Sequence, residues 1–375
     1  MLRRQRELDS SLELDRADPR LHDVLRLGAY QLRWLTRVPS HAAVSTSVEL
    51  ARETVGEGST GYVNRSLRKL SGIGDQLSGT GQSHPDWLVA RWKTQFGTEE
   101  TTRLIAWNDL KPDLILQPAR WDQPTLLQRF REAGVDAEDA PFGAGIRFRP
   151  IADSRYPLAK DLPGYSEGGW IVQDPAHALI ARFAAIPSGE RVYDACAAPG
   201  GKAVALEAAG ARVLAGDARH ERIGRLADTT RRAGVAIRSV AANLEAAPLR
   251  PASVAAVLVD APCTATGTIR RHPDARWRLS STVFARMAER QERLLAAAAA
   301  LVRPGGLLIY ATCSLEPEEN EQVVEHFLKR NREFTRALGP APAPPELVTA
   351  GGDFQSLPQR HGIDGAYAAR LVRAR

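Results

Sequence analysis

Two of the three cysteines in this sequence follow apolar runs that have the composition of buried strands. One run, at residues 254–259, leads into Asp260 and Cys263, and the other, at residues 307–311, leads into Cys313. In an open parallel sheet, the carboxyl ends of the strands meet at the edge where ligands bind. We therefore expect both thiols and the Asp260 carboxylate to lie at one edge of a sheet.

Two thiols and a carboxylate are suited to covalent chemistry on a pyrimidine. A free thiol is only a few per cent ionised at neutral pH, yet it is strongly nucleophilic. Its addition to C6 of the ring turns the inert C5 into a carbon that can attack a methyl group, and a strand-end aspartate can assist by hydrogen bonding to N3. A base must then remove the C5 proton, and a second thiol would assist departure of the first.

A loop that contains two glycines, residues 194–202, follows the first strand of the same pattern and opens a helix. It reads Asp-Ala-Cys-Ala-Ala-Pro-Gly-Gly-Lys, which is neither GxGxxG nor a P-loop. Glycines allow a ligand to approach the backbone, and the helix start offers free N–H groups. Asp217 ends the next strand, where a carboxylate can accept hydrogen bonds from ribose hydroxyls. Together these features predict an adenosine-type cofactor without specifying which.

Two side chains of this loop need an interpretation of their own. Lys202 either neutralises a carboxylate or phosphate, or is a solvated lysine in the first turn of the helix. Cys196 is most simply explained as a small, buried and inert residue.

From Arg191 onward strands and helices alternate, which predicts a parallel, doubly wound sheet. The expected strands lie at 192–195, 212–215, 237–240, 254–259, 307–311 and 367–372, and the longest expected helix spans 282–302. The proline-rich stretch 340–345 is expected to be a loop.

The preceding sequence predicts two further regions. Helical spacing of apolar residues between 20 and 80, broken at Pro39, predicts an all-helical domain, and a Gly/Ser-rich linker follows at 71–85. Helices at 87–96, 99–108 and 125–133 and strands at 114–116 and 146–148 predict a small βαβ-like unit, and residues 168–175 a loop. The tryptophans and arginines of this unit either meet RNA or, for the tryptophans, belong to the core. These residues are Trp87, Trp92, Trp107, Trp121, Arg91, Arg103 and Arg120.

Bulk composition describes an ordinary globular protein of 375 residues, with 43% hydrophobic and 25% charged residues. The N-terminus is charged and no apolar stretch is long enough to span a bilayer, so the cytoplasm is expected. A net charge of +6 suits a polyanionic partner without requiring one. An odd cysteine count argues against a disulfide framework, and the eight histidines show no metal-ligand spacing.

Three motifs taken together resemble the S-adenosylmethionine-dependent RNA cytosine-C5 methyltransferases. They are the loop at 194–202, Asp-Ala-Pro-Cys-Thr-Ala-Thr-Gly-Thr-Ile-Arg-Arg-His-Pro-Asp at 260–274, and Ala-Thr-Cys-Ser-Leu-Glu-Pro-Glu-Glu-Asn-Glu at 311–321. The subgroup that the chain resembles is the bacterial Sun/Fmu-type 16S rRNA enzyme, since residues 25–44 are similar to its NusB-like RNA-binding domain and residues 364–371 also fit. The resemblance covers nearly the whole chain from about residue 20.

The resemblance implies a fold of three parts. These are an all-α NusB-like domain (1–80), a small α+β subdomain (85–165) and a Rossmann-like methyltransferase domain with a mostly parallel sheet (166–375). It also implies S-adenosylmethionine as the cofactor and 16S rRNA, before full subunit assembly, as the partner of a monomeric enzyme.

Residue roles carry over position by position. Cys313 is implied as the nucleophile, Cys263 as the group that assists product release, and Asp260 as a contact of both cytosine and cofactor. Arg270, Arg271 and His272 either meet the RNA backbone or form a solvated loop, and capping explains Glu319 and Asn320 as well as catalysis does. The implied cofactor-binding residues are Cys196, Ala197, Ala198, Pro199, Gly200, Gly201, Lys202, Asp217, Asn243 and Asp260.

The sequence departs from the family pattern at three places. Asn243 stands where the family usually has aspartate, and Gln117-Pro118-Ala119 replaces Arg-Val-Asn after the small strand. The NusB-like domain is expected to be truncated, with the charged segment 1–20 in place of its first helices. Two further functions stay open: a tRNA cytosine-C5 methyltransferase, and a non-catalytic RNA-binding ribosome-assembly factor on a methyltransferase fold.

Overall fold

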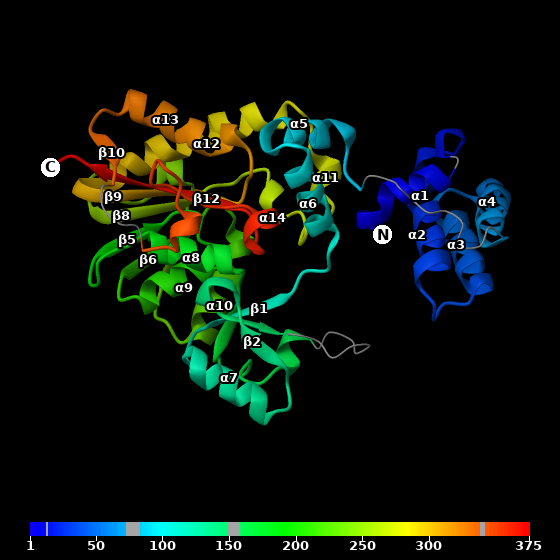
Figure 1. The fold of residues 1–375 in the computed structure, drawn as a ribbon, viewed down its shortest axis with the longest axis horizontal. Helices are drawn as coiled ribbons and strands as arrows, with labels where there is room; N and C mark the ends of the chain where they lie inside the picture. The colour runs from blue at the N-terminus through cyan, green and yellow to red at the C-terminus, as the bar shows by residue number, and fades with distance from the viewer. Residues whose placement is uncertain (13, 73–82, 149–157, 338–341) are drawn as a thin grey trace. The chain divides into compact units, whose positions relative to one another are not determined.

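The computed structural model describes residues 1–12, 14–72, 83–148, 158–337 and 342–375. It divides into two compact units. One comprises Met1–Asp109 with Arg276–Arg278, and the other comprises Leu110–Ala275 with Leu279–Arg375. The first unit is helical, whereas the second contains two β-sheets (Figure 1).

The helical unit is organised by leucines and small residues that face inward. Leu25, Ala29 and Leu67 are buried in its core, and Pro39 separates the second and third helices as predicted. The segment 1–20, expected to be only a charged stretch, also contributes: it forms a helix whose Leu8 is buried in the same core. The helices are α1 (Gln5–Ser11), α2 (His22–Trp34), α3 (Ser40–Thr54), α4 (Thr60–Gly72), α5 (Asp86–Phe96), α6 (Thr98–Asp109) and most of α11 (Ala275–Arg278).

The smaller sheet has four strands in the order β2-β3-β1-β4. Strand β3 pairs antiparallel with both β1 and β2, so those two strands are parallel and α7 connects them across β3. The elements are β1 (Leu114–Pro118), α7 (Gln123–Glu132), β2 (Ala137–Asp139), β3 (Ile146–Phe148) and β4 (Trp170–Val172). The prediction of a loop at 168–175 was therefore wrong over Trp170–Val172, because pairing with β1 outweighs the flanking Gly168, Gly169 and Pro175.

Six strands of the larger sheet, β5 to β9 and β12, lie where the sequence predicted strands, whereas β10 and β11 were not predicted. Its main path is β10-β12-β9-β8-β5-β6-β7, and β11 pairs with β12. The pairs among β5 to β9 are parallel, whereas β10, β11 and β9 each pair antiparallel with β12. The strands are β5 (Arg191–Asp194), β6 (Arg212–Asp217), β7 (Arg238–Ala241), β8 (Val254–Asp260), β9 (Val302–Thr312), β10 (Phe334–Arg336), β11 (Phe354–Ser356) and β12 (Ala366–Arg373). The loop expected at 340–345 lies partly outside the described residues.

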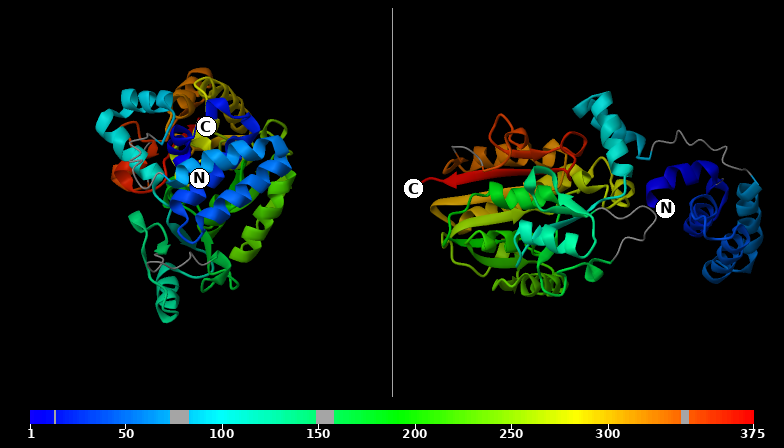
Figure 2. Two further views of the ribbon diagram at one scale, coloured as in Figure 1. Left: turned by 90° about the vertical axis from the view of Figure 1, so that its right-hand side faces the viewer. Right: turned by 60° about the horizontal axis from the view of Figure 1, so that its bottom comes forward.

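Helices cover both faces of this sheet (Figure 1; Figure 2). On one face, α12 (Val283–Leu301) and α13 (Glu321–Arg330) pack through Leu295 and Phe327. On the other face, α8 (Pro175–Phe183), α9 (Gly201–Ala208) and α10 (His220–Ala233) pack through apolar residues such as Leu206 and Leu226. The short helix α14 (Pro358–His361) lies between β11 and β12. The predicted fold, a Rossmann-like parallel sheet preceded by helical and small α+β regions, is confirmed.

No helix within the described ranges combines the length and the apolar character that crossing a membrane requires.

Candidate active site

Two parallel strands bring the two thiols together. Strands β8 and β9 are neighbours, with Asp260 opposite Ala311, so the segments that leave them run side by side. The Cys263 Sγ lies 3.2 Å from the Cys313 Sγ, and both cysteines are free. This separation is that of a sulfur hydrogen bond, so one thiol donates to the other sulfur.

The surroundings of the Cys263 thiol favour its protonated form. The pKa of the Cys263 thiol lies well above its ordinary value, first because the thiol is hydrogen bonded to Cys313 and second because it is buried. The Glu319 carboxylate adds to the rise in the pKa of Cys263, since a nearby negative charge opposes formation of a thiolate. The Cys263 thiol is therefore protonated at neutral pH.

A buried carboxylate is hydrogen bonded to both of the segments that carry the cysteines. Glu319, in the 3-10 helix η9 (Pro317–Glu319), is fully buried. Its Oε1 accepts hydrogen bonds from the backbone N–H of Thr264 (2.9 Å) and from Nε2 of Gln291 (3.0 Å). Its Oε2 accepts from the hydroxyls of Thr264 and Ser314. Burial raises the pKa of Glu319, and these donors oppose the rise.

Asn320 extends the same network on the β9 side. Its side chain hydrogen bonds to the Thr312 hydroxyl (2.5 Å) and donates from Nδ2 to the Ser314 carbonyl (3.0 Å). Although Asn320 precedes α13, its side chain makes no capping hydrogen bond. Capping therefore does not explain Glu319 and Asn320, whose side chains hold the cysteine-bearing segments.

Two consecutive backbone hydrogen bonds also fix the position of Cys313. The Gly267 N–H donates to the Cys313 carbonyl, and the Gly365 N–H donates to the Gly267 carbonyl, each at 2.9 Å. A Cβ at Gly267 would collide with the Gly365 carbonyl oxygen, so only glycine fits here. The segment that carries Cys263 is thus bonded to β9 and to the start of β12.

A cavity of about 490 Å³ lies beside the end of β8; we call it the cofactor cavity. It brings together most of the loop singled out from the sequence with Asp260, Arg271 and His272. The loop residues in its lining are Cys196, Ala197, Ala198, Pro199, Gly201 and Lys202. Gly200 adopts φ +109° at the N-cap of α9, a conformation that L side chains rarely adopt, and thereby turns the loop into the helix.

Lys202 is a buried partner of Asp260 rather than a solvated lysine. Its Nζ lies 2.7 Å from Oδ2 of Asp260 and 2.9 Å from Nδ1 of His177. Burial, together with the charge of Lys202, lowers the pKa of His177 to about 4. The imidazole is therefore neutral and accepts a hydrogen bond from the Lys202 ammonium group. The pair fixes the carboxylate that the sequence places nearest to Cys263.

Asp194 is the group in the cofactor cavity whose hydrogen bonding is incomplete. It ends β5 and is buried. Neither carboxylate oxygen has a hydrogen-bond donor at normal distance and angle among the described residues. Burial first, and the charge of Asp260 second, raise the pKa of Asp194 to about 7, while Lys202 opposes the rise. A buried, unpaired carboxylate beside a cavity fits a cationic ligand group such as the α-ammonium of S-adenosylmethionine.

Asp217 and Asn243 do not line the cofactor cavity. Asp217 is buried at the end of β6, where its Oδ1 accepts from the Arg219 N–H at 2.9 Å. Asn243 is exposed, and its side chain caps a 3-10 turn by accepting from the Glu245 N–H at 3.3 Å. Ribose and adenine contacts at these two residues stay predictions.

The three residues predicted to meet the RNA backbone are placed in different environments. Arg270 is buried, and Arg271 bonds to Asp364 and Asp174, each at 2.6 Å. Only His272 is exposed, so the solvated-loop interpretation fails for the two arginines. Their RNA contacts stay a prediction, although the charge of Arg271 already has two carboxylate partners.

The environments of Cys196 and of two tryptophans show which interpretation of each residue holds. Burial raises the pKa of Cys196 to about 12, which agrees with an inert thiol. Trp92 is fully buried and belongs to the core, and the half-buried Trp121 packs against the hydrophobic core of the smaller sheet.

Sequence reasoning missed Asp194 and His177 as residues of the site. A signal for Asp194 was present, because an aspartate ends each of the strands β5, β6 and β8. His177 carried no such signal, since its contact with Lys202 joins residues on two helices.

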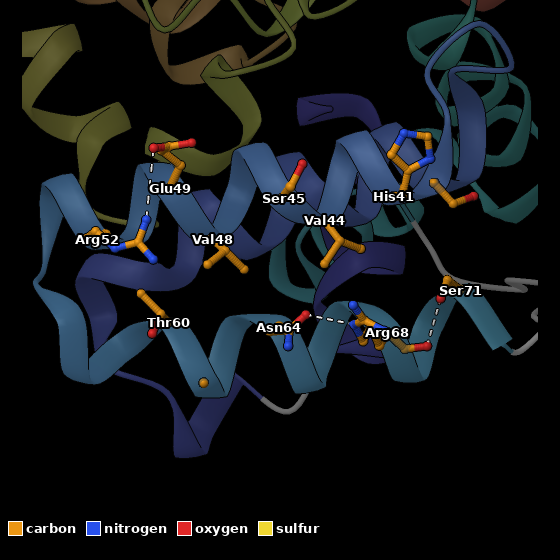
Figure 3. Close-up of a pocket in the computed structure, with 12 residues that line it drawn as sticks. His41, Val44, Ser45, Val48, Glu49, Arg52, Thr60, Asn64, Arg68 and Ser71 are labelled. Carbon is orange, nitrogen blue, oxygen red and sulfur yellow. Dashed lines mark hydrogen bonds and ion pairs between the residues drawn. The ribbon is translucent and has the colours of Figure 1, made fainter.

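Across the described ranges, no group of three histidine, cysteine or acidic residues is placed to hold a metal ion. A further cavity, about 620 Å³, lies between α3 and α4 of the helical unit (Figure 3). Val44 and Val48 lie along it, and polar residues such as Asn64 and Arg68 line its other side. It contains none of the predicted site residues.

Comparison with known proteins agrees with this arrangement. The model of a family described as 16S rRNA methyltransferase RsmB/F matches residues 183–372. The NusB family model matches residues 1–71, and a ferredoxin-like domain of RsmF/B-like methyltransferases matches residues 84–150.

Relatives match over nearly the whole chain. A probable ribosomal RNA small subunit methyltransferase B of Synechocystis is 32% identical over 100% of this chain and 89% of its own length. The ribosomal RNA small subunit methyltransferase B of Pasteurella multocida is 34% identical over 94% of this chain and 80% of its own. The crystal structure of PH0851 superposes with a TM-score of 0.83 at 25% identity, covering 99% of this chain and 88% of that one.

The Rossmann-like sheet, together with the family model that matches residues 183–372, thus identifies an S-adenosylmethionine-dependent methyltransferase. The chain belongs to the 16S rRNA methyltransferase RsmB/F family, and the resemblance to this family noted from the sequence is confirmed.

Proposed function

We propose that this enzyme methylates C5 of a cytosine in 16S rRNA through a covalent bond between Cys313 and C6 of the base. The observation that carries the proposal is the pair of thiols 3.2 Å apart. Cys263 follows Asp260, which lines the cofactor cavity, although neither cysteine is itself a lining residue. The names of the relatives support 16S rRNA as the substrate, and that substrate implies the cytoplasm as the place of action.

Residues of this chain would hold S-adenosylmethionine, which when bound supplies an electrophilic methyl group. The loop from Cys196 to Lys202 would hold the methionine part, with Asp194 facing its ammonium group. Asp217 is the candidate for the ribose hydroxyls. Lys202 neutralises Asp260 and so limits the repulsion between this carboxylate and the buried Asp194.

The roles of the two thiols rest on the family resemblance, which implies Cys313 as the nucleophile. A protonated Cys263 can donate a hydrogen bond to the Cys313 sulfur 3.2 Å away. The Cys313 thiolate forms a bond to C6, the ring electrons move toward C5, and N3 takes up a proton from water; the Asp260 carboxylate then accepts a hydrogen bond from N3–H.

Release of the methylated base breaks the bond between Cys313 and C6. After C5 has gained the methyl group, it loses its proton to a base, the ring electrons re-form the double bond, and the C6–S bond breaks with the electron pair returning to Cys313. Cys263, protonated and 3.2 Å away, is placed to donate its hydrogen bond to the departing sulfur. The target base must be unstacked first, at a cost of roughly a few kcal/mol, because C5 and C6 are inaccessible within a stack.

Two cysteine variants test this assignment. Cys313→Ala should reduce transfer of labelled methyl to a 16S rRNA transcript by about 10⁴-fold or more, as loss of a covalent nucleophile does elsewhere. Cys263→Ala should accumulate a protein–RNA adduct that survives denaturing electrophoresis. The double variant is the matched control and should form none; an adduct in Cys313→Ala alone would require the two roles to be exchanged.

Bisulfite sequencing of rRNA and tRNA from a strain that lacks the gene identifies the substrate. Loss of one methylcytosine in 16S rRNA is expected. Loss confined to tRNA would replace the substrate while leaving the chemistry intact, and no loss in either RNA would favour a non-catalytic assembly factor.

A further inference from the structure

A second cavity in the same unit, about 810 Å³, adjoins the cofactor cavity. Pro199, Thr229 and Arg232 line both cavities, so the two are continuous along the loop before α9 and the last turns of α10. A polymer whose target base lies beside Asp260 can therefore continue along this surface. None of the residues predicted from the sequence to bind the RNA backbone at 270–272 lies here.

Arginines dominate the lining of this second cavity, which we call the arginine cavity. Four of them, Arg120, Arg225, Arg231 and Arg232, face only two carboxylates, Glu167 and Asp228. Arg231 pairs with Asp228 at 2.9 Å in an exposed position, where an ion pair is weak and readily exchanged. Arg225 is exposed and has no ion-pair partner within the described part of the chain. The cavity therefore presents a net positive charge to solvent.

Two of the arginines are held rigidly. The Arg232 guanidinium lies over the Tyr165 ring, 4.3 Å from its centroid, and its Nη1 is buried without a hydrogen-bond partner among the described residues. Arg120 donates to the carbonyls of Arg231 (3.2 Å) and Arg232 (3.1 Å) at the end of α10. A buried donor without an acceptor costs free energy unless a ligand oxygen meets it.

The backbone next to Arg232 in the lining of the arginine cavity is equally constrained. A Cβ at Gly168 would collide with the Arg232 carbonyl oxygen, so only glycine allows the loop before β4 to approach α10 this closely. Close packing of this kind fixes the spacing of the guanidinium groups. The arginine cavity is thus a built surface and not a chance grouping of long side chains.

We propose that the arginine cavity binds phosphates of the single-stranded RNA that flanks the target cytosine. The proposal rests on the RNA methylation proposed above and assigns the surface on which that RNA continues. Guanidinium groups match phosphate oxygens in geometry and charge. A base that has been unstacked for methylation leaves flanking nucleotides single-stranded, and an arginine-lined groove is the surface that such strands bind.

The dependence of RNA binding on salt tests the proposal directly. Affinity of the full-length enzyme for a 16S rRNA transcript is measured by filter retention over a series of KCl concentrations. Each phosphate contact to a single strand contributes about 0.7 to the slope of log K against log salt. The double variant Arg225→Gln/Arg231→Gln should therefore bind with a slope shallower by about 1.4.

Two controls make the result specific. Arg330→Gln should keep the wild-type slope, because Arg330 lies on α13 at the opposite face of the sheet but matches Arg231 in exposure (74% and 75%) and in having a carboxylate partner. Arg225→Lys/Arg231→Lys keeps both charges and should restore the slope, which excludes misfolding as the cause. A double glutamine variant whose slope equals that of Arg330→Gln would overturn the proposal.

The same experiment separates this proposal from the proposed function. If wild-type enzyme transfers labelled methyl to the transcript but the slopes do not differ, the arginine cavity is not the RNA surface. If wild-type enzyme transfers no methyl to any cytosine and the slopes still differ, the RNA surface stands and the proposed reaction fails.

Discussion

The thiol pair and the cofactor cavity lie at the same edge of one sheet, but the chain satisfies their polar groups in opposite ways. Around the thiols, the Glu319 carboxylate accepts four hydrogen bonds from three residues, and Asn320 adds two more. In the cofactor cavity, the buried Asp194 lacks such partners. The first region is completed by the protein itself, whereas the second leaves a binding group whose complement is a ligand.

This difference separates stability from binding. A satisfied buried network stabilises the fold and fixes geometry, because each donor removed from water has recovered an acceptor. An unpaired buried carboxylate opposes folding while it favours a cationic ligand. Substitutions in the two regions should therefore change stability in opposite directions.

The largest change in stability is expected for Glu319→Ala. It leaves buried donors on Thr264, Gln291 and Ser314 without an acceptor, and breaking such a network costs about 3–5 kcal/mol. Urea denaturation measures the loss in the free energy of unfolding. Glu325→Ala, an exposed glutamate on α13, is the control and should change stability by less than about 0.5 kcal/mol. A loss below about 1 kcal/mol in Glu319→Ala would show that the network does not hold the site.

A gain in stability is expected for Asp194→Asn. The pKa of Asp194 is raised to about 7 in the folded protein, so the folded state binds more protons than the unfolded state between about pH 4 and pH 7. Wild-type stability should fall as pH rises through this window. The variant, isosteric with the protonated carboxyl, should match wild type below about pH 4 and exceed it by about 2–4 kcal/mol at pH 8.

The same substitution should weaken cofactor binding. S-adenosylhomocysteine, whose ammonium needs the ionised carboxylate, should bind wild type less tightly as pH falls below about 7, by up to tenfold per pH unit. Calorimetric titration of Asp194→Asn should show weaker binding at pH 8 and a flatter pH profile. Equal pH profiles for the two proteins would place the ammonium elsewhere.

The smallest effect is expected for Gln291→Leu. This side chain, on α12, donates from Nε2 to the Pro262 carbonyl (2.9 Å) and to Glu319 Oε1 (3.0 Å). Because Glu319 keeps its other donors, the free energy of unfolding should fall by only about 1–2 kcal/mol. A loss as large as that of Glu319→Ala would mean that the network depends on the α12 contact and not on the carboxylate.

The sequence predicted the frame of the site but not its contacts. The strands that end at Asp260 and Thr312 follow from their apolar runs, and because parallel strands end at one edge, the meeting of Cys263 and Cys313 was predictable. Strand β4 was not, since its three residues are extended only because β1 lies beside them.

Long-range pairing explains the remaining differences. Arg271 forms an ion pair with Asp174, which is 97 residues away in the sequence. No residue near Arg271 in the chain therefore indicates that it has a carboxylate partner. Likewise, Glu319 reaches back 55 residues to Thr264, whereas its position before a helix left capping and catalysis equally open.

The hydrogen bonds that run from Cys313 through Gly267 to Gly365 also bear on how the protein is made. Gly365 directly precedes β12, the last strand of the sheet, so the peptide groups that position Cys313 come from widely separated stages of synthesis. A nascent chain has both cysteines long before it has Gly365. The thiol pair therefore reaches its final geometry only after translation has passed that residue, and catalysis cannot begin before then.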